Sequence, residues 1–273
     1  MILFILLQKL VPQHWLSRLV GFVAASRVRW IRYLFIHIVI RVFRVDLREA
    51  EREDPDSYDS FNDFFTRALK PGVRPVTGLV ACPADGAVSA VGRIEGNQVF
   101  QAKGLTYSLE KLLGTSDVDK FRDGSFITVY LSPKDYHRVH NPVAGRCTEG
   151  TYIPGKLFSV NDTTAAAVQD LFADNERYVM RFETEQGAMA VVLVGAMIVA
   201  GIQTVWRQTH YPAGQYLQER FGDEKHFRQG DELGRFLMGS TAIVLLENPV
   251  EWQVRSGETV RMGQALAEKS GSH

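Results

Sequence analysis

The sequence has few cysteines and no excess of either charge. Its 273 residues include only Cys82 and Cys147, which have neither CxxC nor zinc-finger spacing, so a disulfide framework is excluded and a reducing compartment is expected. Lys+Arg and Asp+Glu each number 31, so no overall field would draw the chain to nucleic acid. Hydrophobic residues make up 45% of the chain, which excludes general disorder and allows one large domain or a domain with an appendage.

The N-terminal region lacks acidic residues and long apolar runs. Residues 1–45 contain seven cations and no Asp or Glu. The uncharged stretches 10–17 and 19–26 are far shorter than the roughly 20 apolar residues of a spanning helix, and no basic segment precedes an apolar run as it would in a secretory signal. Aromatic and aliphatic residues recur between the cations at helical spacing. The pattern predicts amphipathic helices, and we favour the membrane surface over packing on the protein body as their environment.

The spacing of the apolar residues changes after an acidic linker at residues 46–63. A short helix is predicted from Phe61, with Ser57 or Ser60 as its cap and Pro71 beyond its end. Apolar and β-branched runs punctuated by glycine follow, with helical pattern only near 108–113 and 163–172. We therefore predict an α+β fold, with N-terminal amphipathic helices (1–70) packed beside a mostly antiparallel, β barrel-like or sandwich-like catalytic body (71–273).

Three short clusters carry chemically useful side chains. They are Pro83-Ala84-Asp85-Gly86, the segment from Ser132 to Pro142 with His137 and His140, and the segment from Phe236 to Thr241 with Ser240. Each cluster taken alone is typical of a turn or a strand end. A zinc site using His137, His140 and a third ligand such as Asp135 or His210 is disfavoured, because Pro133 and Pro142 bracket the segment and the HExxH helix is missing. In an extended segment the two imidazoles face opposite ways, which predicts different roles for them.

At these residues the chain resembles the phosphatidylserine decarboxylase family, in its bacterial membrane-associated type. The matching segments follow the family order over nearly the whole chain: Phe61-Asn62-x-Phe64-Phe65-x-Arg67-x-Leu69, Arg74-Pro75, Pro83-Ala84-Asp85-Gly86, Gln101-Ala102-Lys103-Gly104, Tyr136-His137-Arg138-Val139-His140, Pro154-Gly155-x-Leu157-Phe158-Ser159-Val160-Asn161, Asn175-Glu176-Arg177 and Gly239-Ser240-Thr241. One departure is Met238, where the family usually has Leu; the similar volume of Met puts the rate of self-cleavage in doubt more than the cleavage itself.

The resemblance implies a cofactor made from the chain itself. The proenzyme would cut itself between Gly239 and Ser240 into a large β chain (1–239) and a small α chain (240–273), with Asp85, His140 and Ser240 as a charge-relay triad. Ser240 would become a pyruvoyl group, which forms a Schiff base with the substrate, and His137 would serve decarboxylation by protonating the product carbanion. No metal is expected.

The resemblance also implies partners and a location. The substrate would be phosphatidylserine and the products phosphatidylethanolamine and CO₂, with the enzyme attached peripherally to the cytoplasmic side of the cell membrane. The α and β chains would stay together, a homodimer of that unit is left open, and nucleic acid is not expected as a partner. Two alternatives remain: a lipid-binding relative that never matures, and a zinc hydrolase using His137 and His140.

Overall fold

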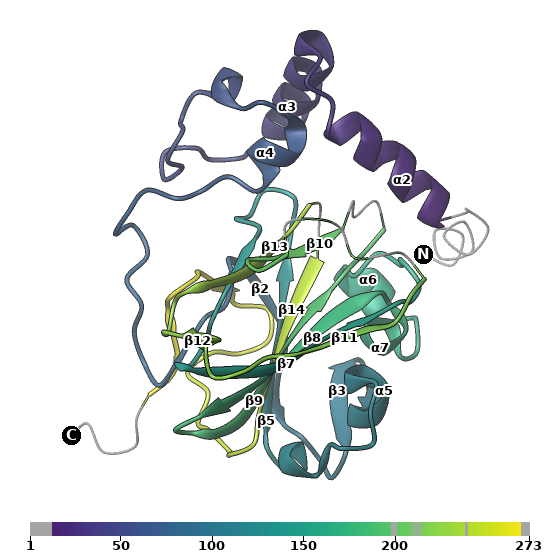
Figure 1. The fold of residues 1–273 in the computed structure, drawn as a ribbon, viewed down its shortest axis with the longest axis vertical. Coiled ribbons are helices and arrows are strands. Elements are labelled where there is room, and N and C mark those ends of the chain that lie inside the picture. The colour runs from purple at the N-terminus through teal and green to yellow at the C-terminus, as the bar shows by residue number, and fades with distance from the viewer. Residues whose placement is uncertain are drawn as a thin grey trace.

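The N-terminal helices lie together at one end of the molecule. The computed structural model describes residues 13–197, 201–207, 209, 211, 214–237 and 240–268. Helix α2 spans Gln13–Ala24, α3 spans Arg29–Phe43 and the short α4 spans Phe61–Phe65. Figure 1 shows these helices above the β-rich body, near the end where β10 (Ile202–Thr204) and β13 (Glu232–Phe236) lie. No helix within the described ranges is long and apolar enough to cross a membrane.

Helix α3 carries apolar side chains on two sides. Ile36 is 1% exposed, and Phe35, Val39 and Ile40 pack with it against a cluster that includes the aromatic residues of α4. A second row, spaced four residues apart, is largely open to solvent: Trp30 (69% exposed), Leu34 (48%), Ile38 (50%) and Val42 (65%). Packing against α4 therefore accounts for only one apolar side of α3.

Helix α4 forms where the sequence predicts it. The Ser60 hydroxyl accepts a hydrogen bond from the Asp63 N–H, which satisfies one of the free donors of the first turn. Phe61, Phe64 and Phe65 are buried, so the helix presents its rings to α3 on one side and to the body on the other.

A large antiparallel sheet forms the centre of the body. Its strands follow the order β11-β7-β8-β9-β14-β5-β2-β15, and β12 also pairs with β7. Their bounds are β2 (Gly86–Arg93), β5 (Ser125–Leu131), β7 (Gly145–Ile153), β8 (Arg177–Thr184), β9 (Gly187–Val194), β11 (Leu217–Arg220), β12 (His226–Phe227), β14 (Ser240–Leu246) and β15 (Thr259–Val260). The α+β class and the antiparallel pairing are confirmed, but across the described strands no ladder closes the sheet into the barrel that we considered.

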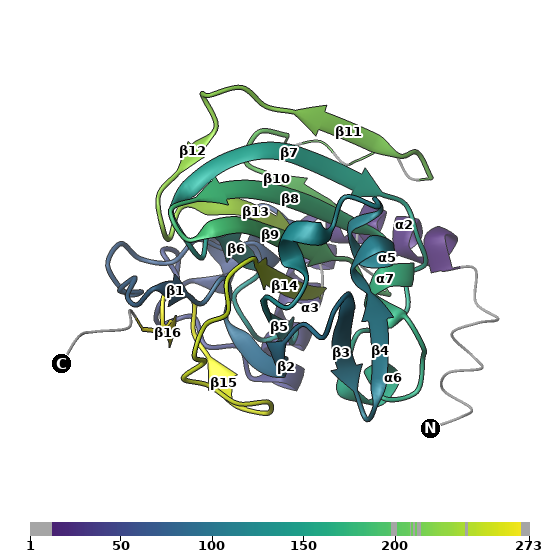
Figure 2. The ribbon, with the colours of Figure 1, turned by 90° about the horizontal axis from the view of Figure 1, so that it is seen from below.

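Both faces of this sheet are covered. On one side lie a three-stranded sheet of β10, β13 and β6 (Arg138–His140) and a pair formed by β1 (Val80–Ala81) and β16 (Ala265–Ala267). On the other side, Figure 2 shows the hairpin of β3 (Gln98–Ala102) and β4 (Leu105–Ser108) beside the helices α5 (Leu109–Leu113), α6 (Asp162–Ala165) and α7 (Leu171–Asp174). Two short 3₁₀ turns, Pro55–Ser57 and Asp119–Phe121, complete the regular structure.

The alternation of side chains along β14 explains its continuous apolar sequence. Ala242, Val244 and Leu246 belong to the core on the β6–β13 side, whereas Ile243 and Leu245 belong to the core on the hairpin side. Side chains two apart share a face, so Ser240 points to the same side as Ala242. The sequence pattern thus directs the first side chain of β14 towards the three-stranded sheet.

Candidate active site

Three segments that are distant in sequence meet at the end of β5. Strand β5 lies between β14 and β2, with Ser240 opposite Leu131 and Ala87 opposite Tyr130. Neighbouring strands are about 4.8 Å apart, so Ser240 and the Asp85-Gly86 turn lie on either side of the point where β5 leads into residues 132–137. A Cβ on Gly86 would lie 2.2 Å from the carbonyl oxygen of Tyr130, so only glycine permits this approach.

Ser240 is fully buried at the first position of β14. Its Oγ has no hydrogen-bond partner among the described residues. A buried hydroxyl without a partner costs free energy, roughly 1–3 kcal/mol, and such an atom calls for a chemical reason. Ser240 is therefore held in the sheet, and no described residue binds its hydroxyl.

His140 is held by hydrogen bonds at both ring nitrogens. Its Nδ1 is 2.8 Å from the carbonyl oxygen of Gly230 and its Nε2 is 2.9 Å from the hydroxyl of Tyr136. A carbonyl can only accept, so the ring proton lies on Nδ1 and the lone pair of Nε2 accepts from Tyr136. Burial lowers the pKa of His140, partly offset by the Gly230 carbonyl and by the negative charges of Glu232 and Asp85. The ring is therefore a neutral base at pH 7.

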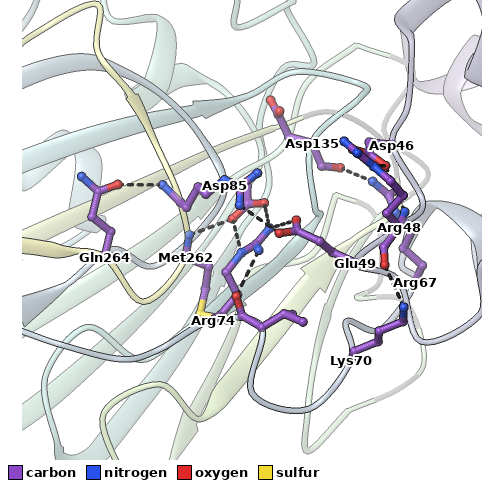
Figure 3. A network of polar contacts seen from close by, with 12 residues as sticks. Asp46, Arg48, Glu49, Arg67, Lys70, Arg74, Asp85, Asp135, Met262 and Gln264 are labelled. Atoms are coloured by element: carbon purple, nitrogen blue, oxygen red, sulfur yellow. Dashed lines mark hydrogen bonds and ion pairs between the residues drawn. The ribbon is translucent and has the colours of Figure 1, made fainter.

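Asp85 is bound by partners other than His140. Its Oδ2 lies 2.8 Å from Nη2 of Arg74, and its Oδ1 accepts a 2.7 Å hydrogen bond from the Met262 N–H. Arg74 is itself held by Glu49 at 2.8 Å, and Glu49 also pairs with Arg261 at 2.9 Å. Figure 3 shows Asp85 within this network. No hydrogen bond joins Asp85 to His140 in this part of the chain, so Asp85 acts on the ring through its charge alone.

His137 has a different environment from His140. It is fully buried, its Nδ1 is 2.8 Å from the carbonyl oxygen of Asp135, and its ring packs against Phe65 with centroids 4.0 Å apart. Its Nε2 has no partner among the described residues. Burial lowers the pKa of His137 to about 3, and the Arg67 guanidinium contributes in the same direction. The Nε2 lone pair is therefore free on a neutral ring.

The backbone near His137 contacts the chain that leads to Ser240. The Phe236 N–H donates to the His137 carbonyl at 3.0 Å, and His140 lies opposite Glu232 in the β6–β13 ladder. Arg138 reaches both Glu232 at 2.8 Å and the Thr66 carbonyl at 2.9 Å. Hydrogen bonds thus connect the histidine segment, residues 137–140, to β13 on one side and to the residue after α4 on the other.

Several of the predicted residues lie outside the described ones. These are Gly239, Met238 and His210. The remaining candidates for zinc do not form a ligand set, because no group of three His, Cys, Asp or Glu side chains within the described ranges is arranged to hold a metal ion. The zinc hydrolase alternative gains no support from the described geometry.

Sequence reasoning missed residues that act on the site through the backbone or through a second side chain. Gly230 and Met262 contribute a carbonyl and an N–H, which leave no mark in a sequence. Tyr136 and Arg74 belong to segments that carry the family resemblance. Their contacts with His140 and Asp85 depend on the fold. The four-residue spacing from Tyr136 to His140 is the one feature of the sequence that points to their contact.

Comparison with known proteins gives one consistent result. A family model described as phosphatidylserine decarboxylase matches residues 61–268, and a second model, described as PSD, matches residues 3–44. A phosphatidylserine decarboxylase proenzyme of Pseudomonas putida (strain GB-1) is 52% identical over 279 residues, covering 97% of each chain. Proteins of the same name from Pseudomonas fluorescens (strain Pf0-1) and Saccharophagus degradans are 50% and 48% identical and cover 98% and 97% of each chain, respectively.

The matched region includes the four candidate site residues. Asp85, His137, His140 and Ser240 all fall between residues 61 and 268. The model at residues 3–44 covers α2 and α3, so the helices and the body are both accounted for. The chain belongs to the phosphatidylserine decarboxylase family.

Proposed function

We propose that this protein decarboxylates phosphatidylserine to phosphatidylethanolamine and CO₂ after cutting its own chain between Gly239 and Ser240. The observation that carries the proposal is the Ser240 hydroxyl, which is buried without a partner at the start of β14 in a chain about half identical to named decarboxylase proenzymes. A hydroxyl that no described residue binds is free to act as a nucleophile.

The self-cleavage begins with the Ser240 hydroxyl. Its Oγ attacks the carbonyl carbon of Gly239 and loses its proton to a base, and the peptide C–N bond breaks to leave an ester and a free amine on residue 240. Loss of the Ser240 Cα proton then breaks the Cβ–O bond, which releases the Gly239 carboxylate and leaves dehydroalanine. Water replaces the nitrogen, ammonia departs, and residue 240 becomes a pyruvoyl group.

His140 is the proposed base. Support comes from its pKa, lowered by burial, and from the Nδ1 hydrogen bond to Gly230, which leaves the lone pair on Nε2. The hydrogen bond between the Tyr136 hydroxyl and Nε2 has to break before Nε2 can accept the proton of Ser240. Asp85 is proposed to stabilise the imidazolium that then forms, by its negative charge and without the direct hydrogen bond of a serine-protease triad.

His137 is proposed to serve the decarboxylation. A pyruvoyl carbonyl accepts the electron pair that CO₂ leaves behind, and the protein has to orient the substrate and supply a proton to the product. The free Nε2 of His137, close to the chain that leads to Ser240, supports this role. With a pKa of about 3 in the uncut chain, the ring has to gain its proton when a negatively charged substrate group comes beside it.

The N-terminal region, residues 1–70, is proposed to attach the catalytic body, residues 71–273, to the cytoplasmic face of the cell membrane. Support comes from the exposed row Trp30, Leu34, Ile38 and Val42 on α3, flanked by arginines. The opposite side of α3 contacts Phe61 of α4, and Phe65 of α4 contacts His137. A lipid held at α3 would therefore be close to the proposed site.

Intact mass spectrometry of the purified chain tests the proposal. We expect two fragments that meet between residues 239 and 240. The small chain should be lighter than its sequence mass by one ammonia molecule, because residue 240 loses its hydroxyl oxygen to Gly239 and exchanges its amine for a ketone oxygen. Ser240→Ala should remain one chain and have no decarboxylase activity. A single uncut wild-type chain would instead support the lipid-binding relative that does not mature.

A further inference from the structure

A small cavity lies beside Asp85. Its volume is about 150 Å³, and its walls come from the end of α3, the segment after α4 and the loop before His137. Asp85 and Tyr136 line it, whereas His140 and Ser240 do not. Figure 3 shows Arg67, Arg74, Asp85 and Asp135 in the polar network around it.

The carboxylates that line this cavity already have partners. Asp85 and Glu49 are bound by Arg74, and Arg261 also binds Glu49. Asp135 accepts hydrogen bonds from the backbone N–H of Ser132 at 2.8 Å and from its hydroxyl at 2.7 Å. Asp46 pairs with Arg48 outside the cavity, at 2.6 Å.

Three cations that line the cavity form no ion pair among the described residues: Arg44, Arg67 and Lys134. Arg67 is the most buried, with 4% of its surface exposed. Its Nη2 donates to the carbonyls of Lys134 and Asp135 at 3.0 and 3.3 Å, and its Nη1 has no partner in that part of the chain. Burial lowers the pKa of Arg67, and the negative charges of Asp85 and Asp135 offset this only in part.

Arg67 lines the cavity and its Nη1 is buried without a hydrogen-bond partner, so a small rotation of the guanidinium would let Nη1 donate to an anion there. Arg44 and Lys134 are exposed and Arg67 is buried. Because the carboxylates of the lining already have partners, the charge left unpaired in the cavity is positive. The cavity is smaller than the usual pocket for an organic ligand and suits a compact oxyanion.

We propose that Arg67, Lys134 and Arg44 form a phosphate-binding site, separate from the reaction site at Ser240. The phosphate group comes either from a membrane phospholipid or from free inorganic phosphate. Arg44 follows directly after Val42 and Phe43, which are 65% and 40% exposed, so the entrance lies at the end of the apolar row of α3. A bound phosphate would lie in a cavity whose walls include Asp85 and Tyr136.

The test uses the full-length Ser240→Ala protein, so that neither self-cleavage nor reaction with an amine can contribute. Titration with inorganic phosphate at constant ionic strength, followed by calorimetry, should show one site. Arg67→Gln should abolish it, and the double variant Arg44→Gln/Lys134→Gln should weaken it roughly tenfold. The control is Lys120→Gln, at an exposed lysine that does not line the cavity. This variant should bind phosphate like the parent.

A second arm identifies the source of the phosphate. Vesicles of phosphatidylglycerol in phosphatidylcholine present phosphate without an amine. If a lipid phosphate occupies the site, Arg44→Gln/Lys134→Gln should lower binding to these vesicles more than a control with the same charge loss, Arg93→Gln/Lys120→Gln. Equal vesicle binding together with weakened phosphate binding would assign the site to free phosphate.

Two results would overturn the proposal. One is the absence of phosphate binding by the folded Ser240→Ala protein. The other is equal phosphate binding by Arg44→Gln/Lys134→Gln and by Lys120→Gln. Because these variants lie on the surface, this comparison still decides the matter if Arg67→Gln does not fold.

Discussion

His137 and His140 are three residues apart, yet their rings make different contacts. His140 bonds to Gly230 and Tyr136, whereas His137 packs on Phe65 and leaves Nε2 free. We expect His140→Ala to remain uncut, because the base for Ser240 is lost, and His137→Ala to be cut yet to lose at least 100-fold in decarboxylation, on the order of a general acid–base contribution. A denaturing gel and a CO₂ release assay measure the two effects. Cleavage of His140→Ala with a block in His137→Ala would reverse the assignment.

The buried imidazoles also predict how stability depends on pH. The pKa of His137 is about 3 in the folded protein and near 6.5 in an unfolded chain, so the unfolded state binds more protons between these values. Stability should be complete above pH 6.5 and fall as pH drops towards 3. For His137 the loss between pH 7 and pH 5 is about 2 kcal/mol, and the lowered pKa of His140 acts in the same direction.

Urea unfolding of the uncut Ser240→Ala protein at pH 7 and pH 5 measures this loss. In a Ser240→Ala/His137→Asn variant the difference between the two pH values should shrink by about the His137 share of 2 kcal/mol. His226→Asn, at an exposed histidine of β12, should leave the difference unchanged. An unaltered pH dependence in the His137 variant would contradict the proposed environment of its ring.

At the scale of elements, α3 links the proposed membrane contact to the site. Its exposed row includes Leu34 and Ile38, which do not contribute to the packed α4 side. Leu34→Glu/Ile38→Glu should lower binding to phosphatidylserine-containing vesicles by roughly tenfold or more, since two apolar side chains are no longer transferred from water. Co-sedimentation measures this.

The control for α3 is Phe100→Glu, at a phenylalanine of β3 that is 42% exposed. It changes an exposed apolar residue on a different part of the surface and should bind vesicles like the parent. Equal binding by the α3 variant and the control would assign the exposed row to another partner.

The elements that could be predicted are those with local causes. Ser60 and the apolar residues after it are sufficient to predict α4, and Ser108 likewise precedes α5 as its cap. The apolar runs punctuated by glycine predict strands, and β9 lies in one of these runs. The pairing order could not be predicted, because β5 pairs with β2 past the β3–β4 hairpin and with β14 across more than a hundred residues. Side-chain alternation does not choose among such partners. For the same reason the sequence does not settle how the strands close, and the barrel-like or sandwich-like detail is not confirmed.

At the scale of the whole molecule, β14 decides what happens to the small chain after cleavage. The strand lies between β5 and β9, and all seven of its residues are buried. Four of them are Ile, Val or Leu, each worth about 1.5–3 kcal/mol when buried, and hydrogen bonds run along both edges. These contributions compare with an association cost of about 4–15 kcal/mol.

We therefore expect the small chain, residues 240–273, to remain bound after the cut. The fragments should elute together in gel filtration under native conditions and separate in guanidinium chloride. The uncut Ser240→Ala protein serves as the size reference. Loss of the small chain under native conditions would show that the strand is held mainly by its peptide linkage to β13.

The central position of β14 has a further consequence for recovery from denaturation. The uncut polypeptide reforms its sheet by a unimolecular process, whereas the matured protein has to recapture its middle strand from solution, at a rate that depends on concentration. Once residue 240 has been converted, no peptide bond can be restored there. We therefore expect the uncut Ser240→Ala protein to refold after dilution from denaturant and the matured protein to refold less completely as its concentration falls.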